Sequence, residues 1–167
     1  MNNPFKAIFW GGLIAGALDI TAACLTAWLR ANVTPVRVLQ SVAAGLLGAA
    51  SYSGGTKTAV LGLALHFLIA TIWTIIFYVA SRKLRFLIER PEVWGLIYGV
   101  VVYAIMNFVV IPLSQFPPSR TPPTLTGRLI GLVIIMFCIG LPIALIVRRF
   151  SRPQTTQTNT DKSLESV

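Results

Sequence analysis

Three polar side chains that can do chemistry lie inside apolar stretches of this chain: Asp19, His66 and Asn107. A carboxylate at mid-membrane depth is energetically costly, so it is normally retained for a function. An imidazole changes its protonation near neutral pH, and an amide both donates and accepts hydrogen bonds. The three side chains can therefore form a hydrogen-bonded network in which Asp19 and His66 exchange a proton.

Helical spacing predicts that these three residues share one buried polar layer. Each of them follows a glycine of its own stretch by three, four or eight residues, which puts it on the glycine face of a helix. At a rise of ~1.5 Å per residue, Asp19 lies roughly 16 Å from the cytoplasmic edge, and His66 and Asn107 lie roughly 20 Å from it. We therefore expect the three side chains to meet inside the bundle.

The polar layer also has a purely structural interpretation. A protonated Asp19 can donate to a backbone carbonyl of a neighbouring helix, and His66 can donate to a threonine such as Thr71 or Thr74. Interhelical hydrogen bonds of this kind contribute about 0.6 kcal/mol on average. The sequence leaves both interpretations open, a structural contact and a site for a proton or a small solute.

Four apolar stretches must position these residues: 7–29, 59–80, 93–113 and 125–147. Each is long enough to cross a ~30 Å hydrocarbon core as a helix. Charged residues make up 11% of the chain, against roughly 25% in soluble domains. The sequence therefore predicts an all-α polytopic membrane protein, a four-transmembrane-helix bundle over residues 1–150 with a disordered cytoplasmic tail over 151–167.

The basic residues predict the orientation of the bundle. Four spans put both termini and the middle loop on one side, and that side carries nine basic residues: Lys6, Arg82, Lys83, Arg85, Arg90, Arg148, Arg149, Arg152 and Lys162. The opposite side carries five: Arg30, Arg37, Lys57, Arg120 and Arg128. By the positive-inside rule we expect both termini in the cytoplasm. These clusters fit the lipid bilayer as a partner, and they form no basic domain of the kind that binds nucleic acid.

The loop after the first span predicts a short additional helix. Thr34 is a typical N-cap, and Pro35 fits the first helical position of a helix over residues 35–50. This helix is too short to span, and Arg37 and Gln40 lie on its polar face. We expect it at the outer interface or packed across the mouth of the bundle. The later loop, residues 112–126, is rich in proline and predicts a stiff connector or a docking surface.

Glycines at intervals of four occur in three of the spans: Gly12 and Gly16, Gly95 and Gly99, and Gly127 and Gly131. Such pairs let two helix backbones approach closely in a membrane. Gly140 and Pro142 instead predict a kink in the fourth span. On this basis a larger side chain at Gly140 should disturb the bundle less than one at Gly16 or Gly99.

The sequence carries no enzyme signature. We find no paired carboxylates, no metalloprotease motif, no glycine-rich phosphate loop and no nucleophile set around the lone His66. We therefore expect no catalytic residues, no cofactor and no metal. A membrane-embedded enzyme remains a minor alternative.

Several segments together resemble a group of small bacterial inner-membrane proteins. The similarity is carried by residues 12–19, 35–40, 65–67 and 98–107. The glycine-rich first helix is also distantly similar to YagU-like membrane proteins, which are linked to acid tolerance. The resemblance implies a bacterial inner membrane and draws attention to Asp19, Arg37, His66 and Asn107 without assigning them roles.

Two functions fit the sequence. The first is a membrane protein that handles protons or a small solute through the polar layer. The second is an accessory or scaffold subunit, which joins a homo-oligomer or a larger membrane complex through its glycine faces and its proline-rich loop. A water-accessible cavity at Asp19 would favour the first function, whereas a filled bundle would favour the second.

Overall fold

The computed structural model describes residues 3–117 and 124–151, and all of its regular elements are helical. Four helical units are long and apolar enough to cross a membrane. The first two are single helices, α1 (Pro4–Ala31) and α3 (Gly55–Lys83). The third consists of α5 (Pro91–Ile105), the π-helical segment η2 (Met106–Val110) and α6 (Ile111–Leu113). The fourth consists of α7 (Leu125–Ile135), the π-helical segment η3 (Met136–Gly140) and α8 (Leu141–Ser151). The predicted all-α, four-span fold is confirmed, and the chain is a multi-pass membrane protein. The predicted tail lies outside the described residues from 152 onward.

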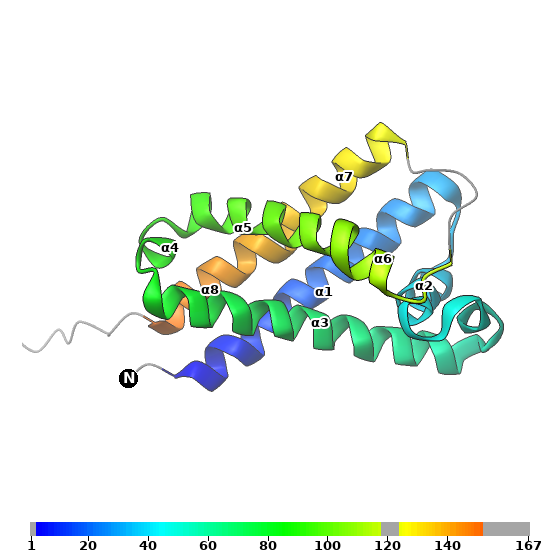
Figure 1. Cartoon of the computed structure of the whole chain (residues 1–167), viewed down its shortest axis with the longest axis horizontal. Coiled ribbons are helices and arrows are strands. Elements are labelled where there is room, and N and C mark those ends of the chain that lie inside the picture. The colour runs from blue at the N-terminus through cyan, green and yellow to red at the C-terminus, as the bar shows by residue number, and fades with distance from the viewer. Residues whose placement is uncertain (1–2, 118–123, 152–167) are drawn as a thin grey trace, which may run out of the picture.

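The four units run alternately up and down the bundle (Figure 1). The start of α1, the short helix α4 (Phe86–Glu89) and the end of α8 lie at one end, and α2 (Pro35–Leu47) lies at the other. Helix α1 packs against α3 and α8, and α5 packs against η3 and α8. Both ends of the described chain therefore lie on the same side of the predicted membrane.

Helix α2 begins where the sequence predicts and ends earlier. The Thr34 hydroxyl accepts a hydrogen bond from the Arg37 N–H, and Pro35 occupies the first turn. The α-helix ends at Leu47 because Gly48 has a φ of 61°, a backbone angle that favours glycine. The chain continues as a 3₁₀ helix, η1 (Gly48–Ser53), rather than as α-helix to residue 50.

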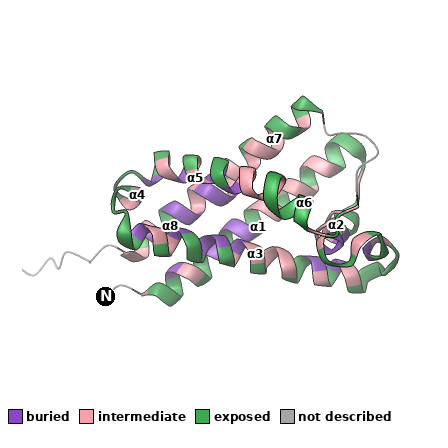
Figure 2. Cartoon of the chain, viewed as in Figure 1, coloured by how far each residue is buried: buried purple, intermediate pink, exposed green. Residues whose placement is uncertain are grey.

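The bundle is filled in one half. Its hydrophobic core joins side chains of all four units, among them Trp73, Phe77 and Ile143, in the half that holds α4. Figure 2 shows the buried residues between the helices and exposed residues on the outward faces. Many outward side chains are large and apolar, such as Leu25, Leu68 and Phe137. Such faces suit a lipid environment, in which apolar side chains need no protein partner.

Two glycine pairs lie at close contacts between spans. A Cβ on Gly12 would stand 2.6 Å from Thr71 Oγ1, and a Cβ on Gly16 would stand 2.8 Å from a ring carbon of Phe67, both on α3. A Cβ on Gly95 would lie 3.0 Å from the Gly140 carbonyl oxygen, and one on Gly99 would lie 2.5 Å from the Cα atom of Met136. These four glycines pack within the chain, on neighbouring spans.

The other glycines of the fourth span behave differently from expectation. Gly131 has room, since a Cβ there would make an ordinary contact of 3.5 Å with Tyr103, and Gly127 would meet Thr124 Oγ1 at 3.3 Å. Gly140 is much tighter, because a Cβ there would collide with the Gly95 carbonyl oxygen and lie 2.8 Å from the Gly99 Cα atom. The expectation that a side chain at Gly140 disturbs the bundle less than one at Gly16 or Gly99 is therefore wrong, because this glycine belongs to a tight contact between the third and fourth spans as well as to the π-helical segment.

Candidate functional site: a polar pair on an intramembrane cavity

Asp19 and His66 lie together inside the bundle. Asp19 comes from the middle of α1 and His66 from α3, and Nε2 of His66 lies 3.9 Å from Oδ2 of Asp19. The His66 and Asp19 side chains are 13% and 17% exposed. Gly16, one turn before Asp19, permits this approach because it adds no side chain between α1 and α3.

The hydrogen bond of His66 fixes where its proton lies. Nε2 stands 2.9 Å from the carbonyl oxygen of Gly16. A carbonyl only accepts, so Nε2 carries a hydrogen and donates it. Its distance of 3.9 Å to Asp19 is an ion-pair distance but is too long for a hydrogen bond. Within residues 3–117 and 124–151, the Asp19 carboxylate accepts no hydrogen bond from the protein and is free to bind water, a proton or a solute.

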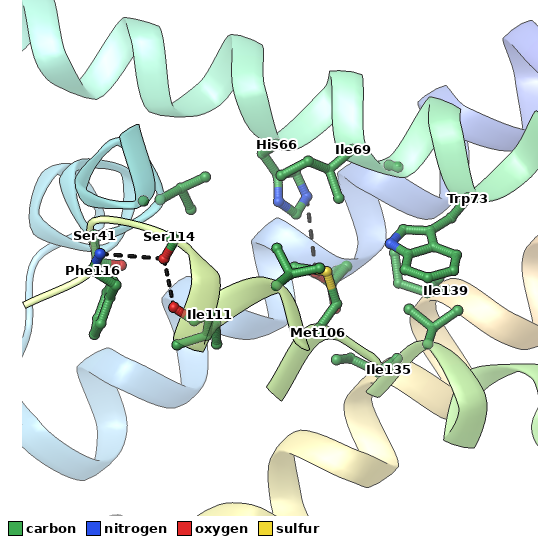
Figure 3. Close-up of a pocket in the computed structure, with 16 residues that line it drawn as sticks. Ser41, His66, Ile69, Trp73, Met106, Ile111, Ser114, Phe116, Ile135 and Ile139 are labelled. Carbon is green, nitrogen blue, oxygen red and sulfur yellow. Dashed lines mark hydrogen bonds and ion pairs between the residues drawn. The ribbon is translucent and has the colours of Figure 1, made fainter. Parts of the chain in front are cut away.

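Both side chains line a cavity of about 380 Å³. Its walls come from α1, α2, α3, the third span and the fourth span, and they are mainly apolar. Figure 3 shows Ser41 and Ser114 at one end of the cavity and Trp73 at the other. His66 lies between these two ends, and Met106 lies near it. The cavity occupies the half of the bundle beyond the filled core, towards α2. Asp19 and His66 are the two ionisable groups that line it among the described residues.

Helix α2 closes this end of the bundle. The buried amide of Gln40 donates to the Gly55 carbonyl at 3.0 Å, which holds α2 on the start of α3. The N–H of Gln115 donates to the Gly45 carbonyl at 3.0 Å, which joins α2 to the segment after α6. Of the two arrangements expected for this helix, packing across the mouth of the bundle is the one observed. Arg37 is exposed and lies over the Tyr52 ring, 4.1 Å from its centroid.

Asn107 does not join the pair. Its amide donates to the Tyr103 carbonyl on its own span at 2.9 Å, and it does not line the cavity. The expected three-residue layer is wrong at this position. Asn107 shares a face with Gly99 and Tyr103, and that face packs on the fourth span rather than on α1 and α3. The third span offers Val102, Met106 and Val110 to the cavity instead.

A second, more open groove of about 530 Å³ runs between α1 and α7 and also reaches Asp19. Small residues line it, including Ala23, Ala27 and Gly131, and Arg30 stands near its outer end. Asp19 and Ile135 line both the groove and the cavity. The carboxylate therefore lies at the wall between an internal space and a groove on the bundle surface.

Spacing alone could not find the apolar residues of the site. Trp73 and Met106 look like ordinary core residues in an apolar stretch. The polar Ser114 was also missed, because the sequence places it in a loop. One usable signal is the tyrosine hydroxyl of Tyr98, which must find a partner inside a span. It donates to the Trp73 carbonyl at 2.7 Å and so links the third span to α3 beside the cavity.

Within the described residues, no three side chains of His, Cys, Asp or Glu gather into a group that could hold a metal ion. Comparison of the chain with protein-family models, with curated proteins and with solved structures finds no match.

Proposed function

We propose that this chain is a membrane protein that handles a proton or a small solute at the Asp19–His66 pair. The observation that carries the proposal is the cavity of about 380 Å³ that both side chains line. A carboxylate without a hydrogen-bond donor is costly in a membrane and is normally kept for a task. An imidazole 3.9 Å away supplies a second group that can take up or release a proton.

The Asp19 position supports passage as well as binding. The carboxylate lines the internal cavity and the groove between α1 and α7, so one group faces two spaces. The π-helical segments η2 and η3 contribute Met106, Val110 and Ile139 to the cavity wall. Segments of this kind break the regular packing of a helix and are frequent at functional sites.

We propose a bacterial inner membrane as the location, with both termini and α4 in the cytoplasm. The location rests on the resemblance of residues 12–19, 35–40, 65–67 and 98–107 to small bacterial inner-membrane proteins. The orientation rests on the excess of basic residues at the α4 end. In the described residues that end carries Lys6, Arg82, Lys83, Arg85, Arg90, Arg148 and Arg149.

The accessory-subunit alternative has less support. It needs glycine faces that are free for a partner. Gly12, Gly16, Gly95 and Gly99 already pack on neighbouring spans, which leaves the pair Gly127 and Gly131 for such a contact. The proline-rich loop, its other contact surface, lies partly outside the described residues, at 118–123.

Proton flux in reconstituted vesicles tests the proposal. An imposed pH gradient should collapse faster with the parent protein than in protein-free vesicles. Asp19→Asn keeps the shape of the side chain but cannot ionise, and His66→Gln keeps a hydrogen-bond donor; each should abolish the added flux. The double variant should be no worse than either single variant, because the two residues act as one unit.

Two results would count against the proton role. Parent vesicles that leak no faster than empty ones, over a range of gradients, would leave the accessory-subunit alternative ahead. Unchanged flux in a folded Asp19→Asn variant would show that the proton pathway does not pass through this pair.

A further inference from the structure

We infer that the solute of this cavity is an organic cation with an apolar body, which binds with its charge at Asp19. The inference rests on the proposed function and names the class of its solute. It follows from three properties of the cavity: the sign of its charge, the nature of its walls and its size.

The charge of the cavity favours a cation. Asp19 is the acidic group in its wall, and no Lys or Arg side chain within the described residues lines it. The carboxylate accepts no hydrogen bond from the described residues, and the basic group beside it, His66, carries a positive charge only when it is protonated. A bound ammonium group would supply a counter-charge in a low-dielectric space, where ion pairing is strong. An anion would instead meet a carboxylate of the same sign.

The walls favour an apolar body attached to that charge. Ile69, Trp73, Val102, Met106 and Ile135 surround the pair, so a fully hydrated ion would lose its water without gaining polar partners. An indole ring attracts cations through its face, and a methionine side chain adapts to irregular ligands. The Ser41 and Ser114 hydroxyls at the α2 end donate to the Val38 and Ile111 carbonyls, at 2.6 Å and 2.7 Å, and Ser114 Oγ also accepts from the Phe116 N–H at 3.2 Å. Each hydroxyl oxygen keeps an acceptor lone pair for a polar tip.

The size of the cavity sets the scale of the ligand. Its volume of about 380 Å³ is at the lower end of the range of small-molecule sites, roughly 300 to 1,000 Å³. A single aromatic or branched alkyl group with one ammonium is of the right size. A bare inorganic ion would leave most of the apolar wall unoccupied.

Binding of shape-matched probes to the parent protein in phosphatidylcholine nanodiscs tests the inference. The probes are benzyltrimethylammonium and phenylmethanesulfonate, which have a similar shape and opposite charge, and tetramethylammonium, which lacks the aromatic body. Equilibrium dialysis against empty nanodiscs corrects for partition into lipid. We expect benzyltrimethylammonium to bind at one site, tetramethylammonium to bind at least tenfold more weakly, and the sulfonate not to bind.

Two variants locate the binding site. Asp19→Asn should weaken benzyltrimethylammonium binding at least tenfold, which corresponds to about 1.4 kcal/mol. Glu89→Gln removes an exposed carboxylate from α4, far from the cavity, and should leave binding unchanged. Ser41→Phe should also weaken binding, since it fills the cavity from α2 without touching the charge.

If Asp19→Asn does not fold, a thiol at position 114 tests instead whether the cation occupies the cavity. In a background of Cys24→Ser and Cys138→Ala, Ser114→Cys places a reactive group in the cavity wall. Benzyltrimethylammonium should slow its modification by a methanethiosulfonate reagent, and phenylmethanesulfonate should not.

The results separate the inference from the proposed function. Equal binding of the sulfonate, or parent-like cation binding by folded Asp19→Asn, overturns the cation inference. A neutral analogue, 3-phenylpropan-1-ol, that binds as tightly as the cation and is excluded by Ser41→Phe would also overturn it, while a solute site in the cavity would stand. Absence of binding by every probe overturns it too, and the flux experiment then decides the proposed function independently.

Discussion

At the scale of single residues, Asp19 is expected to lower the stability of the folded bundle. Its carboxylate lies inside the membrane-spanning bundle, accepts no hydrogen bond from the described protein and stands 3.9 Å from an imidazole that donates to the Gly16 carbonyl instead. A residue kept to stabilise the bundle would be expected to make a direct hydrogen bond across helices. The geometry therefore matches a residue kept for function at the expense of stability.

Asp19→Leu should consequently stabilise the protein. Replacing a poorly paired buried charge with an apolar side chain is often neutral or stabilising by about 1–4 kcal/mol, and the adjoining cavity has room for the larger side chain. Thermal unfolding in detergent should show a higher midpoint than the parent. Thr21→Leu, on the exposed side of α1, serves as the control and should change little. A clear loss of stability in Asp19→Leu would identify Asp19 as a structural residue.

Part of the site could be predicted from residue spacing. The Asp19–His66 pair follows from helical periodicity and depth. Gly16, one turn before Asp19, lies against α3, although Gly62, one turn before His66, packs on α2 and not on α1. The same reasoning failed for Asn107. A glycine face indicates that a helix packs closely, but it does not identify the helix against which it packs. The residues that line the cavity depend on which helices are neighbours, so they could not be predicted.

At the scale of helices, a tight backbone contact joins α5 to η3. Gly95, Gly99 and Gly140 approach each other through their backbones, and no flexible side chain lies between them. The positions of the four spans were predictable from hydropathy, although most of the helices extend two to four residues beyond the predicted ends. The start of α2 was predictable because a capping threonine and a proline act locally. The π-helical segments were not predictable, since they depend on the packing of whole spans.

Gly140→Ala should therefore destabilise the protein strongly. The added methyl group would collide with the Gly95 carbonyl and crowd the Gly99 backbone, and overpacking of this kind costs about 1–3 kcal/mol or more. Gly131→Ala is the matched control on the same span, where the methyl group has room and alanine is favoured over glycine in a helix by about 1 kcal/mol. Thermal unfolding of the two variants in one detergent makes the comparison. Equal midpoints would contradict the close contact of α5 and η3.

At the scale of the whole molecule, the bundle is divided into a filled half and a hollow half. The core around Phe77 and Ile143 fills the end that carries α4, and the cavity lies at the other end, against α2. A packed end can anchor the helices while the hollow end exchanges its contents, and this division places Asp19 and His66 at the boundary. The orientation of the bundle then decides which side of the membrane the hollow half faces.

Cysteine labelling should show that the hollow half faces away from the cytoplasm. In the background of Cys24→Ser and Cys138→Ala, Ser53→Cys places a thiol at the exposed end of η1, and Glu89→Cys places one on α4. A membrane-impermeant maleimide added to intact cells should label the first variant and not the second, and permeabilised cells should label both. The physical reason is the excess of basic residues around α4, from which the positive-inside rule predicts a cytoplasmic location for that end. Labelling of both variants in intact cells would contradict the four-span topology, and labelling of Glu89→Cys alone would reverse the orientation, so that the cavity faces the cytoplasm.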